Sequence, residues 1–218
     1  MENKTKQWLE AIKPYNEHKM KLNPKKAALL VIDMQNDFIK KGSMVYTPMA
    51  ETIVPNLKRL ISTCRKAKIS IIYTAHVHQD PKIDGGMTAQ WWPELRDKKV
   101  LVAGSKGAEI HSAIAPKPNE KVIYKHRYSA FYNTDLEIVL RGLGVTDLII
   151  SGVMTNICCE STTRDAFFRD FRIFFLADGT GSGDDDLHLG TLRALAYAFA
   201  YVTTVHEIMR SLLKTGIS

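Results

Sequence analysis

Short apolar runs of strand length recur along the chain and are separated by segments with helical spacing. The first run, Ala27 to Ile32, is continuously hydrophobic and is followed by the carboxylate Asp33. Comparable runs occupy residues 69–74, 121–125, 147–150, 172–177 and 201–205. Continuous hydrophobicity, as opposed to strict alternation, is typical of strands that are buried on both faces of a parallel sheet.

The segments between these runs place apolar residues at helical intervals, which predicts helices near residues 50–68, 134–144, 161–171, 187–199 and 206–213. Six buried strands that alternate with helices predict an α/β fold: a three-layer, doubly wound, mostly parallel six-stranded sheet with helices on both faces. Pro55 fits the first of these helices only if it falls in the first turn. Residues 107–114 are expected to add a short helix.

The chain is expected to divide into a polar arm or helix at 1–25 and a single domain at 26–218. The arm is rich in lysine, lacks the apolar core of a signal peptide, and is expected to form a helix or extended arm over residues 5–22. Trp8, Leu9 and Ile12 are its candidate docking residues. Residues 79–106 are expected to form a long loop, and loops of that size are often functional.

Composition narrows the possible partners. Hydrophobic residues make up 45% and charged residues 24% of the chain, which is ordinary for an ordered globular protein. No apolar run approaches the roughly 20 residues that a membrane span needs. Three cysteines do not suggest a disulfide framework, so a reducing cytoplasm is expected. The net charge of +7 comes from scattered lysines and arginines, so we expect a small-molecule substrate and no nucleic acid.

Polar and reactive residues fall where the predicted strands end. Asp33, His76, Lys125, Cys158 and Asp178 all lie at or just beyond a strand terminus. Ligands of open parallel sheets bind outside the carboxyl ends of the strands. We therefore expect these five side chains to converge on one site at that edge.

The segment that contains Cys158 resembles a strand, a turn and a helix. Gly152 permits a sharp turn, and Thr155 or Asn156 could cap the helix that follows. Cys158 would then lie in the first helical turn, where free N–H groups favour a thiolate. Lys125 would lower the thiol pKa further, and Asp33 could accept and return the proton. The alternative is that Cys158 and Cys159 are two small buried hydrophobic residues.

Three motifs then point to a known family. They are Val31 to Phe38, Lys125 with the following Tyr128 to Phe131, and Gly152 to Cys158. Together they resemble the signatures of the isochorismatase-like cysteine hydrolases. The resemblance implies an Asp33–Lys125–Cys158 triad in which the cysteine attacks a carbonyl carbon. It also implies a cis peptide at Val153–Met154, which would direct backbone N–H groups of Met154 and Cys158 at an oxyanion.

Details of the motifs favour one branch of this family. A cysteine at position 158 favours cleavage of an amide or ureide C–N bond through a thioester, and the segment around it is most similar to ureide and carbamoyl amidohydrolases. The alternatives are a nicotinamidase, a vinyl-ether hydrolase of the isochorismatase type in which the thiol is incidental, and a non-catalytic binding module. Nicotinamidases bind a metal through an Asp-x-His pair, where this chain has His76 and His78. With so few ligands in view, we expect no metal and no cofactor.

Six side chains are candidates for the walls of the substrate pocket: Phe38, His76, Trp92, Tyr128, Phe131 and Asn156. The aromatic ones could equally belong to the core. The resemblance further implies a homodimer or homotetramer.

Overall fold

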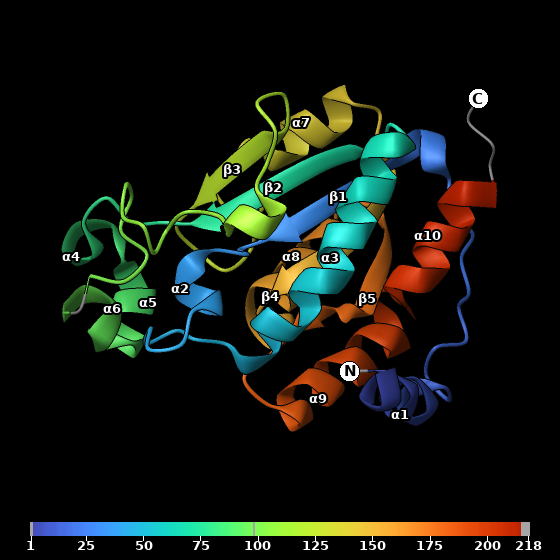
Figure 1. The fold of residues 1–218 in the computed structure, drawn as a ribbon, viewed down its shortest axis with the longest axis horizontal. Coiled ribbons are helices and arrows are strands. Elements are labelled where there is room, and N and C mark those ends of the chain that lie inside the picture. Colours follow the sequence, from blue (N-terminus) through green and yellow to red (C-terminus); the bar gives the residue numbers. More distant parts are fainter. Residues whose placement is uncertain (1, 98, 215–218) are drawn as a thin grey trace.

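The computed structural model describes residues 2–97 and 99–214, and it contains one six-stranded parallel sheet (Figure 1). The strand order is β3-β2-β1-β4-β5-β6, so the chain builds outward from β1 in one direction and then returns to continue from β4 in the other. The doubly wound α/β prediction is confirmed. The strands are β1 (Ala27–Ile32), β2 (Ser70–His76), β3 (Lys121–Lys125), β4 (Asp147–Val153), β5 (Arg172–Gly181) and β6 (Tyr201–Thr203).

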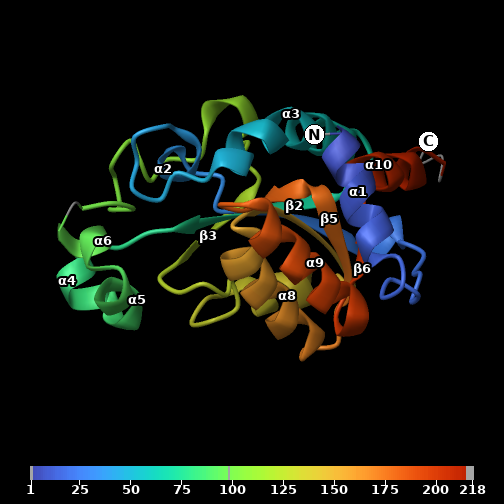
Figure 2. The same cartoon turned by 90° about the horizontal axis from the view of Figure 1, so that it is seen from below.

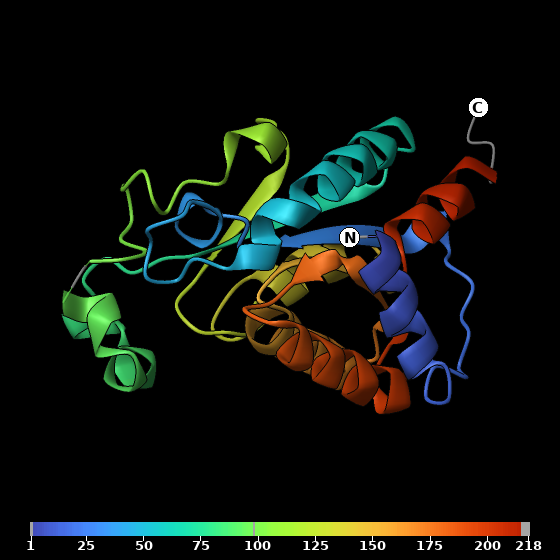
Figure 3. The same cartoon turned by 60° about the horizontal axis from the view of Figure 1, so that its bottom comes forward.

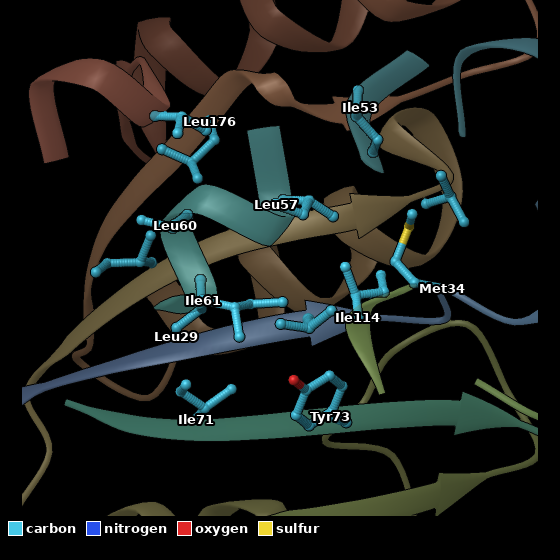
Figure 4. Close-up of a cluster of buried hydrophobic side chains, with 14 of the residues drawn as sticks. Leu29, Met34, Ile53, Leu57, Leu60, Ile61, Ile71, Tyr73, Ile114 and Leu176 are labelled. Atoms are coloured by element: carbon cyan, nitrogen blue, oxygen red, sulfur yellow. The ribbon is translucent and has the colours of Figure 1, made fainter. Parts of the chain in front are cut away.

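Helices cover both faces of the sheet, as Figures 2 and 3 show. One face carries α3 (Pro48–Lys66) and α10 (Val205–Lys214), and the other carries α7 (Leu136–Gly142), α8 (Glu160–Phe167) and α9 (Asp185–Ala198). Strand β1 serves both cores, because Leu29 packs with the α3 side and Leu30 with the α9 side. Figure 4 shows Leu29 against Leu57 and Leu60 of α3. Burial on both faces explains the continuous hydrophobicity of β1.

The proline in α3 contradicts its expected position. Pro55 lies well inside the 19-residue helix, beyond the first turn. Pro55 is exposed and lacks the backbone N–H that would form a helical hydrogen bond. Ile53, Leu57 and Leu60 on either side of it still pack into the core. Tertiary packing of the apolar face therefore outweighs the local cost of the proline.

The N-terminal arm forms a shorter helix than expected, α1 (Glu2–Ile12), and residues 16–23 are irregular. Trp8 and Ile12 are buried, as expected, and Leu9 packs beside them. Lys4 forms an ion pair with Asp185 at the start of α9, with 2.6 Å between the charged atoms. The arm is therefore docked on α9, while its separation from the domain at residue 26 stays a prediction.

Residues 79–106 are not a plain loop, because they contain α4 (Pro81–Asp84), α5 (Gly86–Trp91) and α6 (Pro93–Asp97). These short helices stand away from the sheet beyond the β2 and β3 ends (Figure 1). The helix expected at 107–114 is only the short 3₁₀ turn η2 (Ser112–Ile114). A similar 3₁₀ turn, η1 (Pro24–Lys26), precedes β1, and α2 (Asn36–Ile39) follows it. Within the described residues, no helix is long and apolar enough to cross a membrane.

Candidate active site

A fully buried ion pair lies at the carboxyl edge of the sheet. Asp33 follows β1 and Lys125 ends β3, and Lys125 Nζ lies 2.6 Å from Asp33 Oδ2. Strand β2 lies between these two strands, and its Thr74 donates a 2.5 Å hydrogen bond to Asp33 Oδ1. Asp33 has a positive φ of 49°, a region that Asp tolerates better than most residues. Three neighbouring strands thus fix the carboxylate and the ammonium in place.

Cys158 completes this cluster. Its Sγ lies 3.4 Å from Lys125 Nζ, and it is within 4.8 Å of a carboxylate oxygen of Asp33. The structure therefore brings together all three residues of the triad that the resemblance implied. Four of the five strand-end residues expected at this edge meet here, since His76 also lies within 4.8 Å of Asp33 and Cys158.

Asp178 does not join them. Strand β5 continues past it to Gly181, and Asp178 Oδ1 instead accepts a 2.7 Å hydrogen bond from the backbone N–H of Val205 at the start of α10. Its expected place in the site was wrong, because the strand ends four residues later than the hydrophobic run suggests.

The turn that holds Cys158 differs from the expected capped α-helix. Residues Thr155–Cys159 form a π-helical turn that leads into α8. Met154 precedes this turn and makes no side-chain cap, and the side chains of Thr155 and Asn156 bond to other segments. The predicted caps were therefore wrong.

The backbone before this turn agrees with the resemblance. The Val153–Met154 peptide is cis. At Gly152, with φ of 110°, a Cβ atom would lie only 2.0 Å from the carbonyl oxygen of Ile32. Only glycine fits this approach of β4 to β1.

Burial controls the charge state of the thiol. Burial raises the pKa of Cys158 to about 12, and the neighbouring Lys125 ammonium opposes this only in part. Burial also disfavours charge on Lys125, but Asp33 and Cys158 outweigh it and raise the pKa of Lys125 above its ordinary value. Burial therefore disfavours the thiolate that the turn and Lys125 were expected to favour.

A cavity of about 290 Å³ opens directly onto Cys158. Phe38, His76, Trp92, Tyr128 and Asn156 line it, as expected from the sequence. The surface of these walls is predominantly apolar, and none of the described residues that line the cavity is a lysine or arginine.

The sequence did not predict all of the cavity walls correctly. Phe131 was expected here but is buried against Phe171 in the core. Sequence reasoning did not identify the remaining aliphatic, aromatic and hydroxyl walls: Met44, Val45, Tyr46, Thr88, Leu95, Leu101, Met154, Ile157 and Leu187. Their position depends on loops whose folding the local pattern does not determine.

His76 is held by Gln35, a residue whose role the sequence did not reveal. The amide of Gln35 accepts a 2.8 Å hydrogen bond from the backbone N–H of His76 and donates to its carbonyl at 3.0 Å and to that of Ala108 at 2.9 Å. Burial, and then the charge of Lys125, lower the pKa of His76 well below its ordinary value. Among the described residues its Nε2 has no hydrogen-bond partner, and a ring nitrogen of this histidine lies within 4.8 Å of Cys158 Sγ.

Comparison with known proteins agrees with this geometry. The model of the isochorismatase domain matches residues 27–207. The chain belongs to the isochorismatase family. It is 39% identical over 201 residues to Nicotinamidase 3 of Arabidopsis thaliana, covering 91% of this chain and 95% of the relative. It is 30% identical over 207 residues to ureidoacrylate amidohydrolase RutB of Caulobacter segnis, covering 85% of each.

A solved structure of a related protein confirms the fold. The cysteine hydrolase from Pseudomonas syringae has a TM-score of 0.86 and 29% identity, covering 90% of this chain and 96% of that one. Together with the two amidohydrolase relatives, this makes the chain an isochorismatase-like amidohydrolase, a cysteine hydrolase that cleaves C–N bonds.

Among the residues that the structure describes, two groups of side chains have the composition of a metal site. One is Asp33, His76 and Cys158, where the ammonium of Lys125 already neutralises the carboxylate. The other is His78, Asp84 and His126. Next to this second group, the Arg127 guanidinium donates to the backbone carbonyls of Asp84 and His126, so a cation is close by. A fixed cation beside each group fits a metal poorly, and the expectation of no metal stays a prediction.

Proposed function

We propose that Cys158 is the nucleophile in the hydrolysis of a neutral, planar amide with an apolar acyl group, and that the reaction releases ammonia. The carrying observation is the cavity at Cys158, whose walls are apolar and include no lysine or arginine among the described residues. Burying a carboxylate in such a cavity would cost several kcal/mol without a cation to pair with it. The walls therefore favour an uncharged substrate.

The proposed reaction starts from the Cys158 thiol, because burial disfavours its thiolate. As Cys158 Sγ bonds to the amide carbon, its proton passes to Asp33, and the Lys125 ammonium balances the charge. The backbone N–H groups of Met154 and Cys158 would stabilise the oxyanion. Collapse of this intermediate breaks the C–N bond, and the leaving nitrogen takes the proton from Asp33 as ammonia departs. Asp33 then removes a proton from water, whose oxygen bonds to the thioester carbon. The C–S bond breaks, the acyl group leaves as a carboxylic acid, and Asp33 returns the proton to Cys158 Sγ.

Nicotinamide is the first substrate to test. The relative named Nicotinamidase 3 supports it, and nicotinamide is a flat, uncharged aromatic amide that suits apolar walls. Ureidoacrylate, suggested by the relative RutB and by the cysteine motif, carries a carboxylate that these walls do not pair. We therefore place nicotinamide ahead of ureides and carbamoyl acids.

The test measures ammonia release from nicotinamide, benzamide and ureidoacrylate by the wild-type protein, Cys158→Ala and Cys159→Ala. We expect kcat/KM for nicotinamide to exceed that for ureidoacrylate by at least tenfold, since one unpaired buried charge costs more than 1.4 kcal/mol. Cys158→Ala should lose at least about a thousandfold in kcat. Cys159→Ala is the matched control, because Cys159 is the adjacent buried thiol and its Sγ lies 4.0 Å from the carbonyl oxygen of Ser151.

Two results would contradict this proposal in different ways. Preference for ureidoacrylate would overturn the inference from the pocket walls and leave the thiol mechanism intact. Full activity in Cys158→Ala would overturn the thiol mechanism and favour protonation chemistry by Asp33, as in a vinyl-ether hydrolase.

We also propose that the protein works in a reducing compartment such as the cytoplasm. Cys64, Cys158 and Cys159 are all free and buried. The proposed nucleophile acts only as a reduced thiol, which that compartment maintains.

A further inference from the structure

Ser182 and helix α9 form side-chain hydrogen bonds to the turn that holds Cys158. Ser182 Oγ donates a 2.6 Å hydrogen bond to Asn156 Oδ1, and His188 Nδ1 lies 2.8 Å from Thr155 Oγ1. Thr155 and His188 are both fully buried. These two bonds hold the turn two and three residues before Cys158.

A third bond holds the turn on the other side of the nucleophile. Thr191 Oγ1, one turn along α9 from His188, donates a 2.8 Å hydrogen bond to Glu160 Oε2, two residues after Cys158. Residues 182–191 therefore bracket Cys158 with side-chain hydrogen bonds before and after it. All three hydrogen bonds fall within three residues of the thiol.

The hydrogen bonds of His188 define its tautomer. Its Nε2 lies 3.1 Å from the carbonyl oxygen of Ala177, which can only accept, so Nε2 carries the proton. Nδ1 is then the acceptor, and the Thr155 hydroxyl donates to it. Burial lowers the pKa of His188 to about 4, so this neutral arrangement persists at neutral pH. Both ring nitrogens are used within the protein, and neither faces the substrate cavity.

The N-terminal helix α1 packs against His188. The Trp8 ring packs on the His188 ring with 4.3 Å between centroids. The ion pair of Lys4 with Asp185 holds α1 over the same end of α9. Helix α1 precedes the segment matched by the isochorismatase domain, which begins at residue 27.

We propose that His188 is a positioning residue that sets the Cys158 turn through Thr155, and that helix α1 holds His188 in place through Trp8. The inference rests on the proposed role of Cys158 as the nucleophile. It does not depend on which amide is the substrate.

Thr155→Val tests the hydroxyl directly, because valine has nearly the same shape and removes only the donor. We expect kcat to fall about tenfold, with KM changed less than threefold, since small displacements of a reacting atom are costly. Alkylation of Cys158 by iodoacetamide, followed by mass spectrometry of the intact protein, should become several-fold faster, because a loosened turn exposes a thiol that is now buried. Thr155→Ser keeps the hydroxyl and should retain several-fold more kcat than Thr155→Val.

His188 variants separate its two hydrogen bonds. In His188→Asn the amide oxygen takes the place of Nδ1 and can accept from Thr155, whereas His188→Leu removes the acceptor. We expect His188→Asn to retain several-fold more kcat than His188→Leu. The combination of Thr155→Val with His188→Leu should cost no more than the worse single variant, because both remove the same bond.

The contribution of the arm is tested by Trp8→Leu against Ile12→Ala. Both remove buried side-chain volume from α1 and should lower the thermal midpoint. Only Trp8→Leu should also lower kcat and speed the alkylation of Cys158, both measured well below the thermal midpoint. Equal effects of the two variants on kcat would overturn the role of the arm.

The whole proposal is overturned if Thr155→Val keeps both kcat and the alkylation rate within twofold of the wild-type values. Failure of the nucleophile assignment looks different, because then Cys158→Ala stays active while the alkylation rates still report on the turn.

Discussion

At the scale of single residues, Lys125 places a charged group where no solvent reaches it. It is fully buried and pairs with the equally buried Asp33. Removing one member of such a pair leaves an uncompensated charge, which typically costs 3–5 kcal/mol. We expect Lys125→Met to lower the free energy of unfolding by about that amount and to abolish amide hydrolysis.

A double variant separates the stability role of the pair from its chemistry. Lys125→Met combined with Asp33→Asn removes both charges and keeps a residue that tolerates the positive φ at position 33, so it should recover much of the stability that Lys125→Met loses, measured by urea unfolding. It should still show no hydrolysis. If the double variant is less stable than the single one, the ion pair is not the cause of the loss.

The sequence identifies this pair because hydrophobic runs mark where strands end, and parallel strands end at one edge. The same reasoning failed for Asp178, because β5 continues beyond its hydrophobic run. Gln35, Thr155 and His188 could not be identified in this way. Gln35 and His76 lie 41 residues apart in the chain, and Thr155 and His188 lie 33 apart, so only the packed fold brings each pair together.

At the scale of elements, the proline inside α3 leads to a prediction. Pro55 is exposed, so its replacement does not disturb the core. Proline in a helix interior costs up to about 3 kcal/mol relative to alanine. We expect Pro55→Ala to stabilise the protein by about 1 kcal/mol or more, measured as a rise in the thermal midpoint, with kcat unchanged. A fall in the midpoint would mean that the helix is curved around the proline and depends on it.

The elements that the sequence predicted well are those with long hydrophobic patterns, namely the six strands and the helices α3, α7 and α9. It failed where tertiary contacts determine the backbone. The sequence from Thr155 to Cys159 has the residue spacing of an ordinary helix start. In the structure it forms a π-helical turn, and Thr155 is hydrogen-bonded to His188 of α9. The short helices α4, α5 and α6 are too brief to show periodicity.

At the scale of the whole molecule, buried neutral histidines make stability depend on pH. The pKa of His188 is about 4 in the folded protein, against about 6.5 when unfolded. The unfolded state therefore binds more protons between these values, so this stability is fully present above about pH 6.5 and is lost as the pH falls toward 4. We expect His188 alone to reduce the free energy of unfolding by about 2 kcal/mol between pH 7 and pH 5.

Urea unfolding at pH 7, 6 and 5 measures this slope. His188→Asn should flatten it, whereas His206→Asn, which removes an exposed histidine, should leave it unchanged. An equal slope in the wild-type protein and His188→Asn would contradict the assignment. The implied homodimer or homotetramer also belongs to this scale and stays a prediction, which sedimentation of the wild-type protein tests.

The separate origins of the cavity walls and the ion pair have a consequence for inheritance. Asp33, Lys125 and Cys158 come from the ends of sheet strands, whereas Thr88, Trp92, Leu95 and Leu101 come from the excursion between β2 and β3. Changes in the segment between β2 and β3 can therefore alter which amides the cavity accepts, while the three reactive residues stay the same. Substrate specificity can thus diverge on one scaffold through substitutions in that segment alone.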